Sequence, residues 1–186
     1  MSASGTVVAI DMGGTKTAVA TFERDGSLRG RSVEPTTPGR PQATIGRLAG
    51  RARELDGYPG AGAVCLALPA IVDEAGRVAW AAASVADWAG FEVAQALRSA
   101  FDLPSAAMFD GYAATLGEAT FGAGRGVDSL ATLIVGTGFG AGVWLDGRVV
   151  EGRTGVAGAV GWNRWPLPAA SLSEPIEAIA SGPGIV

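Results

Sequence analysis

Short apolar runs that end in glycine-rich turns dominate the pattern of this chain. Two stretches, Val7–Lys16 (VVAIDMGGTK) and Ala131–Gly142 (ATLIVGTGFGAG), each begin with a β-branched run typical of a buried strand. After each glycine turn a second apolar run leads to an Asp-Gly pair, at Asp25-Gly26 and at Asp146-Gly147, which is a strong hairpin signal. The sequence therefore predicts the same arrangement twice: strand, glycine turn, strand, Asp-Gly turn, strand.

Between these two hairpins the hydrophobic pattern alternates between helical and extended spacing. It predicts helices over Ala43–Leu55, Phe91–Phe101 and Ala113–Phe121, and strands over Ala63–Leu68 and Ser105–Phe109. Ala81–Trp88 is rich in small residues, and we expect a loop there. This order indicates a mixed α/β fold with a duplicated core.

Length and composition indicate a globular protein. With 186 residues, 48% of them hydrophobic, the chain can bury a sizeable core. A net charge of −4 without a basic cluster argues against a nucleic-acid partner. No apolar run approaches the roughly 18 residues that a membrane span needs, and the N-terminus lacks the pattern of a signal peptide. We expect a cytoplasmic protein without a membrane partner.

The chain contains no histidine, which excludes several catalytic arrangements. A Ser-His-Asp triad, a Cys-His dyad and a histidine-ligated zinc site are all ruled out. Lys16 is the single lysine. Acid–base chemistry therefore falls to an Asp or Glu side chain near the glycine turns.

The two glycine turns have the composition of phosphate-binding loops. Glycine lets backbone N–H groups approach phosphate oxygens closely. Asp11 ends the first strand and suits Mg²⁺, held directly or through water, while Thr15 and Lys16 add a hydroxyl group and a positive charge. The alternative is that both are only tight hairpin turns. Two such turns together, with Asp11 and Thr15 in place, favour binding of a polyphosphate.

Asp110 is the candidate for chemistry. It follows a predicted strand and precedes a predicted helix, at the edge where open α/β sheets bind ligands. Considered alone, it is better interpreted as a helix N-cap. With two phosphate-type turns and no histidine in the chain, a general base that accepts a hydroxyl proton becomes the better interpretation.

Four segments in this order resemble motifs of the ROK family (repressors, open reading frames, sugar kinases) from Val7 to the end of the chain. IDMGGTK at Ile10–Lys16 resembles its first phosphate loop, and Gly136–Gly152 its second phosphate segment. Phe109–Gly126 is similar to its catalytic segment, in which Asp110 matches the base, and Ile176–Val186 resembles its Glu-containing helix.

The resemblance implies an α/β protein with a duplicated ribonuclease H-like, actin-like ATPase fold. Its lobes would be residues 1–112 and residues 113–186, the second incomplete because family kinases continue further. It implies ATP- and Mg²⁺-dependent phosphorylation of a sugar or sugar-like hydroxyl with Asp110 as general base. The implied ATP-binding residues are Asp11, Gly13, Gly14, Thr15, Lys16, Gly136, Thr137, Gly138 and Gly140.

The expected sugar site departs from the family pattern. At two positions where the family usually has asparagine, this chain has Ser84 and Phe109. Where the family usually has a glutamate and a histidine, this chain has Ala159 and Trp162. The three zinc cysteines have no counterpart in residues 163–173, so we expect no zinc site. The expected substrate residues are Ser84, Phe109, Asp110, Ala159, Trp162 and Glu177. Loss of polar groups predicts a less polar or modified sugar in place of glucose.

The sequence leaves three hypotheses open. The first is a sugar kinase, and the second is a degenerate relative that binds a nucleotide or small ligand without phosphoryl transfer. The third is an inactive fragment, since the chain is short for the family. Apolar surface left uncovered in the second lobe would favour a homodimer.

Overall fold

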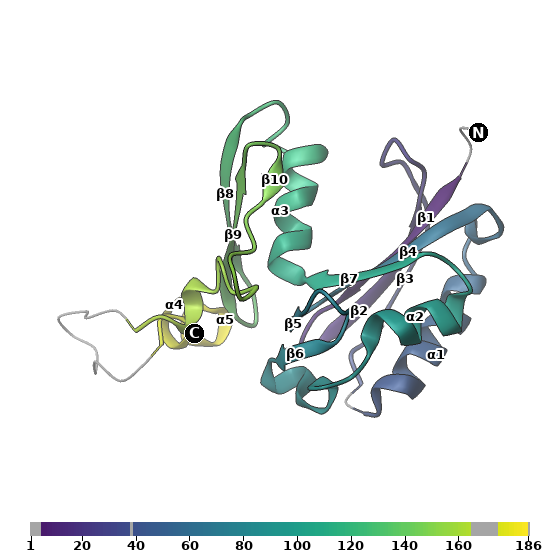
Figure 1. The fold of residues 1–186 in the computed structure, drawn as a ribbon, viewed down its shortest axis with the longest axis horizontal. Helices are drawn as coiled ribbons and strands as arrows, with labels where there is room; N and C mark the ends of the chain where they lie inside the picture. The colour runs from purple at the N-terminus through teal and green to yellow at the C-terminus, as the bar shows by residue number, and fades with distance from the viewer. Residues whose placement is uncertain (1–4, 38, 165–174, 186) are drawn as a thin grey trace. The chain divides into compact units, whose positions relative to one another are not determined.

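The structure, a computed structural model, describes residues 5–37, 39–164 and 175–185 (Figure 1). It divides into two compact units, Met1–Asp110 and Gly111–Val186. The first unit contains a five-stranded sheet with two helices, and the second contains a three-stranded sheet with one long helix.

The sheet of the first unit combines an antiparallel hairpin with two parallel strands. Strands β1 (Thr6–Met12), β2 (Lys16–Phe22) and β3 (Leu28–Pro35) pair antiparallel in sequence. Strands β4 (Ala61–Leu68) and β7 (Ser105–Phe109) extend the sheet parallel to β1, in the order β3-β2-β1-β4-β7. The carboxyl ends of β1, β4 and β7 therefore share one edge.

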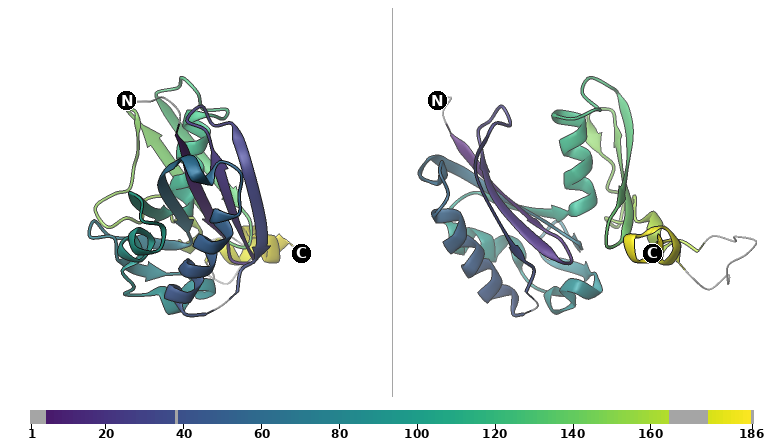
Figure 2. Two further views of the ribbon diagram at one scale, coloured as in Figure 1. Left: turned by 90° about the vertical axis from the view of Figure 1, so that its right-hand side faces the viewer. Right: turned by 180° about the vertical axis from the view of Figure 1, so that it is seen from behind.

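Helices α1 (Pro41–Arg53) and α2 (Val93–Phe101) lie side by side on one face of this sheet (Figures 1 and 2). Both have the apolar stripe that the sequence pattern predicts. The stripes pack on every second residue of β1 and β4. This core contains Val8, Ile10, Met12, Ile45, Leu48, Val64, Leu66, Leu68, Val93 and Leu97, each at most 2% exposed.

The segment after β4 is more regular than predicted. Strands β5 (Ala70–Val72) and β6 (Val78–Ala81) form a small hairpin, and a 3₁₀ helix, η2 (Ala83–Trp88), follows. The predicted loop over Ala81–Trp88 is therefore wrong. Val85 and Trp88 are both buried, and the backbone is kinked at Val85 (φ −133°, ψ 30°), so tertiary burial organises this stretch more than a regular helical repeat does. The short 3₁₀ helix η1 (Tyr58–Gly60) precedes β4.

In the second unit, helix α3 (Asp110–Thr120) lies along an antiparallel sheet (Figure 1). The sheet has the order β10-β9-β8, formed by β8 (Ser129–Val135), β9 (Phe139–Leu145) and β10 (Arg148–Val149). The 3₁₀ helix η3 (Val160–Trp162) and the short helices α4 (Glu177–Ala180) and α5 (Gly182–Ile185) complete the described part of this unit.

The two predicted Asp-Gly hairpin turns are present, with different geometries. Asp146 and Gly147 both have positive φ (50° and 77°), as the type I′ turn between two strands requires. In the first hairpin Gly26 has a positive φ of 88°, and the Ser27 N–H donates to Asp25 Oδ1 at 2.9 Å. The alternation of strands and turns was thus correctly predicted in both places.

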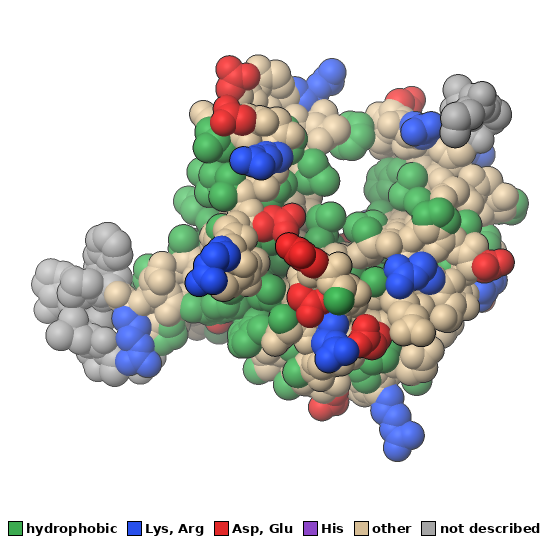
Figure 3. All heavy atoms as spheres, in the orientation of Figure 1, with side chains coloured by type: hydrophobic (Ala, Val, Ile, Leu, Met, Phe, Trp, Pro, Cys, Tyr) green, Lys and Arg blue, Asp and Glu red, His purple; other side chains and the backbone are tan. Residues whose placement is uncertain are grey.

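Two features bear on membrane and nucleic-acid partners: the length of the apolar helices and the distribution of charge on the surface. In the described part of the chain, no helix combines the length and hydrophobicity that crossing a bilayer requires. On the face drawn in Figure 3 the Lys and Arg side chains lie singly, with acidic side chains between them. This distribution is consistent with the net charge of −4.

Candidate functional site

The first glycine turn joins β1 to β2 at the carboxyl end of β1. It is closed by a hydrogen bond from the Gly13 N–H to the Lys16 carbonyl oxygen at 2.9 Å. The side chains of Thr15 and Lys16 are exposed at its tip. The turn thus presents a hydroxyl group and a positive charge to solvent, as the sequence predicts for a phosphate site.

Asp11 lies just before this turn and has a perturbed carboxyl group. The protein around it reduces its solvation and raises its pKa above the ordinary value, while the nearby Lys16 ammonium group acts in the opposite direction. A divalent cation would favour the ionised carboxylate. One carboxylate, one hydroxyl and one ammonium group at a single turn therefore fit a metal-bound phosphate.

Asp110 shares this sheet edge with Asp11. Asp11 pairs with Ala67 of β4, and Ala67 pairs with Met108 of β7. Since neighbouring strands lie about 4.8 Å apart, the backbones of Asp11 and Met108 are about 10 Å apart. Asp110 stands two residues beyond Met108, as the first residue of α3, and is half-buried.

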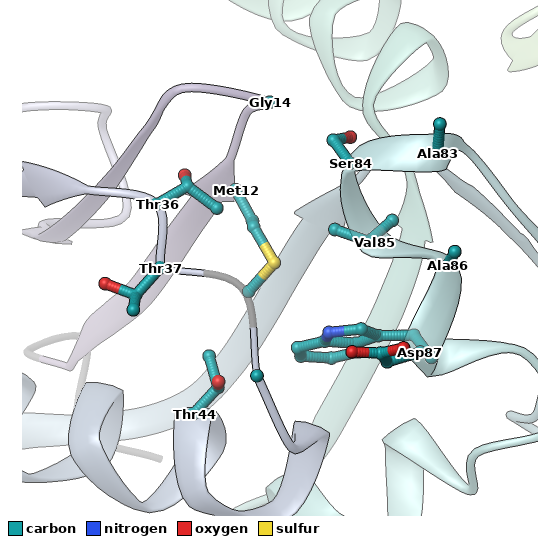
Figure 4. Close-up of a pocket in the computed structure, with 12 residues that line it drawn as sticks. Met12, Gly14, Thr36, Thr37, Thr44, Ala83, Ser84, Val85, Ala86 and Asp87 are labelled. Atoms are coloured by element: carbon teal, nitrogen blue, oxygen red, sulfur yellow. The ribbon is translucent and has the colours of Figure 1, made fainter.

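A pocket of about 190 Å³ opens beside the first glycine turn (Figure 4). Ser84 of η2 and Gly14 of the turn both line it, so the structure brings together two residues that the sequence assigned separately. Figure 4 shows Thr36 and Thr37 on one wall and Ser84 and Val85 on the opposite wall. Further lining residues include Met12, Thr44, Asp87 and Trp88.

The sequence analysis missed the threonine wall of this pocket. Thr36 and Thr37 belong to a Pro- and Thr-rich stretch after β3 that has no periodic pattern. Only the pairing of β3 with β2 brings this stretch to the glycine turn. The cluster of hydroxyl residues was the one available signal.

The second glycine turn, in the second unit, joins β8 to β9 through Gly136, Thr137 and Gly138. Gly136 and Thr137 are exposed, and the Gly136 N–H donates to the Gly138 carbonyl oxygen at 2.9 Å. The Gly182 N–H of α5 donates to the Gly136 carbonyl oxygen at 2.7 Å. Gly140 lies within β9, where an added Cβ would meet nothing within 4 Å.

Glu177, a predicted sugar contact, lies at this second turn. Its Oε2 accepts the Phe139 N–H at 2.9 Å, and a Cβ at Gly138 would come within 2.6 Å of the same oxygen. Ala159 is half-buried, and Trp162 in η3 is 38% exposed. The second unit therefore groups Glu177 with the glycine turn.

One further acidic side chain and the expected absence of a zinc site complete the comparison. Glu118 of α3 accepts the Ala123 N–H at 3.0 Å, so its carboxylate closes the C-terminal turn of that helix. Among the described residues, no three His, Cys, Asp or Glu side chains gather as a metal site. Of residues 163–173, where the sequence lacks zinc cysteines, residues 165–173 lie outside the described ranges.

The fold is that of solved sugar kinases with an actin-like ATPase architecture. A ROK family glucokinase from Streptomyces griseus, solved with glucose and AMPPNP, has a TM-score of 0.83 and 27% identity over 97% of this chain and 58% of its own. A ROK hexokinase from Thermus thermophilus has a TM-score of 0.77 and 28% identity over 96% of this chain and 61% of its own.

The sequence matches the ROK family over residues 7–186, and the chain belongs to this family. Among its relatives, the N-acetylmannosamine kinase of Shigella boydii is 31% identical over 185 residues, 97% of this chain and 62% of the relative. The chain thus spans about three fifths of the length of such relatives.

Proposed function

We propose that this chain provides the phosphate-binding and catalytic elements of an ATP- and Mg²⁺-dependent kinase that acts on a sugar or sugar-like hydroxyl. The observation that carries the proposal is that Asp11, the first glycine turn and Asp110 all lie at one edge of the first sheet. The sugar kinases among its relatives, for glucose and for N-acetylmannosamine, support the substrate class.

In this proposal Asp110 accepts the proton of the attacking hydroxyl, and its position after β7 fixes where that hydroxyl lies. Asp11 holds Mg²⁺, directly or through a water molecule, and bound Mg²⁺ supplies positive charge that stabilises the phosphates. Thr15 and Lys16 orient the phosphates at the first turn. Positioning and electrostatic stabilisation account for most of the expected rate enhancement.

The second glycine turn, with Gly136, Thr137, Gly138 and Gly140, contributes further phosphate contacts in the proposal. Ser84, Phe109, Ala159, Trp162 and Glu177 are proposed substrate neighbours. Because Oε2 of Glu177 accepts the Phe139 N–H, a sugar hydroxyl would bind the other carboxylate oxygen. Few polar groups remain for sugar hydroxyls, which favours a modified sugar such as an N-acylated hexosamine over glucose.

The test measures Mg²⁺-dependent ATP binding by calorimetry and phosphate transfer to a panel that includes glucose and N-acetylmannosamine. Asp110→Asn should retain ATP and sugar binding and lose turnover by about 10²-fold or more, as for removal of a general base. Asp102→Asn is the matched control, because this exposed residue has a φ of 56° that asparagine also tolerates.

Equal turnover in Asp110→Asn and wild type would refute the assignment of the base. ATP binding by the wild type without transfer to any sugar would favour the second hypothesis, a binding protein. That hypothesis draws on the apolar residues at Phe109, Ala159 and Trp162. The homodimer and the cytoplasmic location remain predictions, and sedimentation analysis tests the former.

A further inference from the structure

Thr36, the first residue after β3, contacts the first glycine turn twice. Its backbone N–H donates to the Thr15 carbonyl oxygen at 2.9 Å. Its side-chain hydroxyl donates to the Gly13 carbonyl oxygen at 2.8 Å. Two carbonyl groups on either side of Gly14 are therefore held by one residue that directly follows another strand, β3.

A second hydroxyl connects this contact to the interior of the sheet. Thr17 of β2 is 1% exposed, and its Oγ1 lies 2.9 Å from Oγ1 of Thr36. Because the Thr36 hydroxyl proton is used on Gly13, the Thr17 hydroxyl is the donor in this pair. Hydrogen bonds thus run from buried Thr17 through Thr36 to the glycine turn.

The turn needs such support because of its composition. Gly13 and Gly14 have the largest backbone freedom of any residue type, so an unsupported turn would lose much entropy on binding phosphate. Hydrogen bonds that orient the Gly13 and Thr15 carbonyl groups limit the directions of the adjoining peptide N–H groups. Preorganised donors bind an anion more tightly than donors that must first be ordered.

We propose that Thr36 is a positioning residue that holds the first glycine turn in its phosphate-binding conformation, with Thr17 as its support. The proposal rests on the proposed function of that turn. Thr36 also lines the pocket beside Gly14 (Figure 4), so its contact with the turn borders the place where the nucleotide phosphates are expected.

The test compares Thr36→Val, which removes the hydroxyl at nearly constant shape, with Thr36→Ser, which retains it. Thr21→Val is the matched control. Thr21 lies on β2, as Thr17 does, but away from the turn, and its hydroxyl donates a hydrogen bond to the Asp56 carbonyl oxygen. Amide hydrogen exchange of the segment Gly13–Lys16 is measured in the full chain without ligand. Calorimetry then measures the affinity for Mg²⁺·ATP.

Thr36→Val should speed exchange of the turn and weaken Mg²⁺·ATP binding, each by about fivefold, as expected for one net hydrogen bond. Thr36→Ser should restore most of both values, and Thr21→Val should change neither. Unchanged exchange in Thr36→Val overturns the proposal. Faster exchange with unchanged nucleotide affinity also overturns it, because the contact would then serve stability alone.

Failure of the proposed function can be told apart from failure of this inference. A wild-type chain that binds no Mg²⁺·ATP contradicts the kinase proposal directly. The exchange of the turn then decides on Thr36: faster exchange in the valine variant and recovery in the serine variant support its role in holding the turn. The absence of that difference overturns it.

Discussion

Gly142 on β9 is a position where a single added methyl group should destabilise the second unit. A Cβ there would overlap Thr115 Oγ1 of α3 and lie 2.8 Å from the Gly111 carbonyl oxygen. Gly142 is not among the described glycines with positive φ, so backbone conformation does not require glycine here. The requirement is space, because α3 packs directly on the strand.

The neighbours of Gly142 cannot move aside at low cost. Thr115 is fully buried, and its hydroxyl donates to the Gly111 carbonyl oxygen at 2.8 Å. Relief of the overlap must either separate α3 from β9 or break this hydrogen bond. Overpacking of a core costs about 1–3 kcal/mol, and the lost hydrogen bond adds about 1 kcal/mol. We therefore expect Gly142→Ala to lose about 2–4 kcal/mol.

Gly140→Ala provides the matched control for this prediction. Gly140 lies two residues earlier on the same face of β9, and a Cβ there meets nothing within 4 Å. That substitution should stay within about 1 kcal/mol of the wild type, on the stabilising side, because alanine reduces the freedom of the unfolded chain.

Urea unfolding and amide hydrogen exchange of β8 and β9 measure these effects, and exchange assigns them to the second unit. Adding Thr115→Ala to Gly142→Ala should recover part of the loss, because it removes the overlapping hydroxyl. Equal stability of the Gly142→Ala and Gly140→Ala variants would refute the packing of α3 on β9 described above.

Three further predictions concern the site and the core. Asp11→Asn should raise Tm at pH 7, because the raised pKa of Asp11 means that its ionised form disfavours folding. This gain in Tm should shrink as the pH falls through the acidic range, where the wild-type carboxyl group becomes protonated, and the affinity for Mg²⁺·ATP should drop. Leu97→Ala should cost about 2–5 kcal/mol in urea unfolding, because Leu97 is fully buried, whereas exposed Leu28→Ala should cost under about 1 kcal/mol. Glu177→Ala should weaken nucleotide binding, because the Phe139 N–H loses its acceptor, and Glu177→Gln should restore binding by supplying another acceptor. A change in the KM for sugar alone would instead favour the predicted sugar contact.

The local elements of this fold were largely predictable because each depends on a short-range pattern. The β-branched run before the first glycine turn is β1, and the predicted strand Ser105–Phe109 is β7 with the same bounds. The helix predicted over Phe91–Phe101 begins two residues later, at Val93. Asp110 is the first residue of α3, whereas the sequence placed it before the helix.

Features that depend on distant contacts were not predictable in the same way. The small residues of Ala81–Trp88 carry no helical pattern, and η2 forms because Val85 and Trp88 are buried against the first core. Thr36 has no sequence signal of its own, since its partners Gly13 and Thr15 lie more than 20 residues earlier. The sequence also indicated a role for Glu177 in sugar binding without showing its bond to Phe139.

The sequence by itself determined the family, the order of most of the elements and the residue types available for chemistry. Hydrophobic period, glycine turns and the absence of histidine are local or compositional properties, so they can be deduced without coordinates. Only the tertiary structure decided that β1, β4 and β7 run parallel and bring Asp11 and Asp110 to one edge. It also decided that Thr36 supports the first glycine turn and that Gly142 must be glycine. The physical reason is that strand pairing and helix packing join residues far apart in the chain, and these contacts depend on shape and hydrogen-bond geometry that no local pattern encodes.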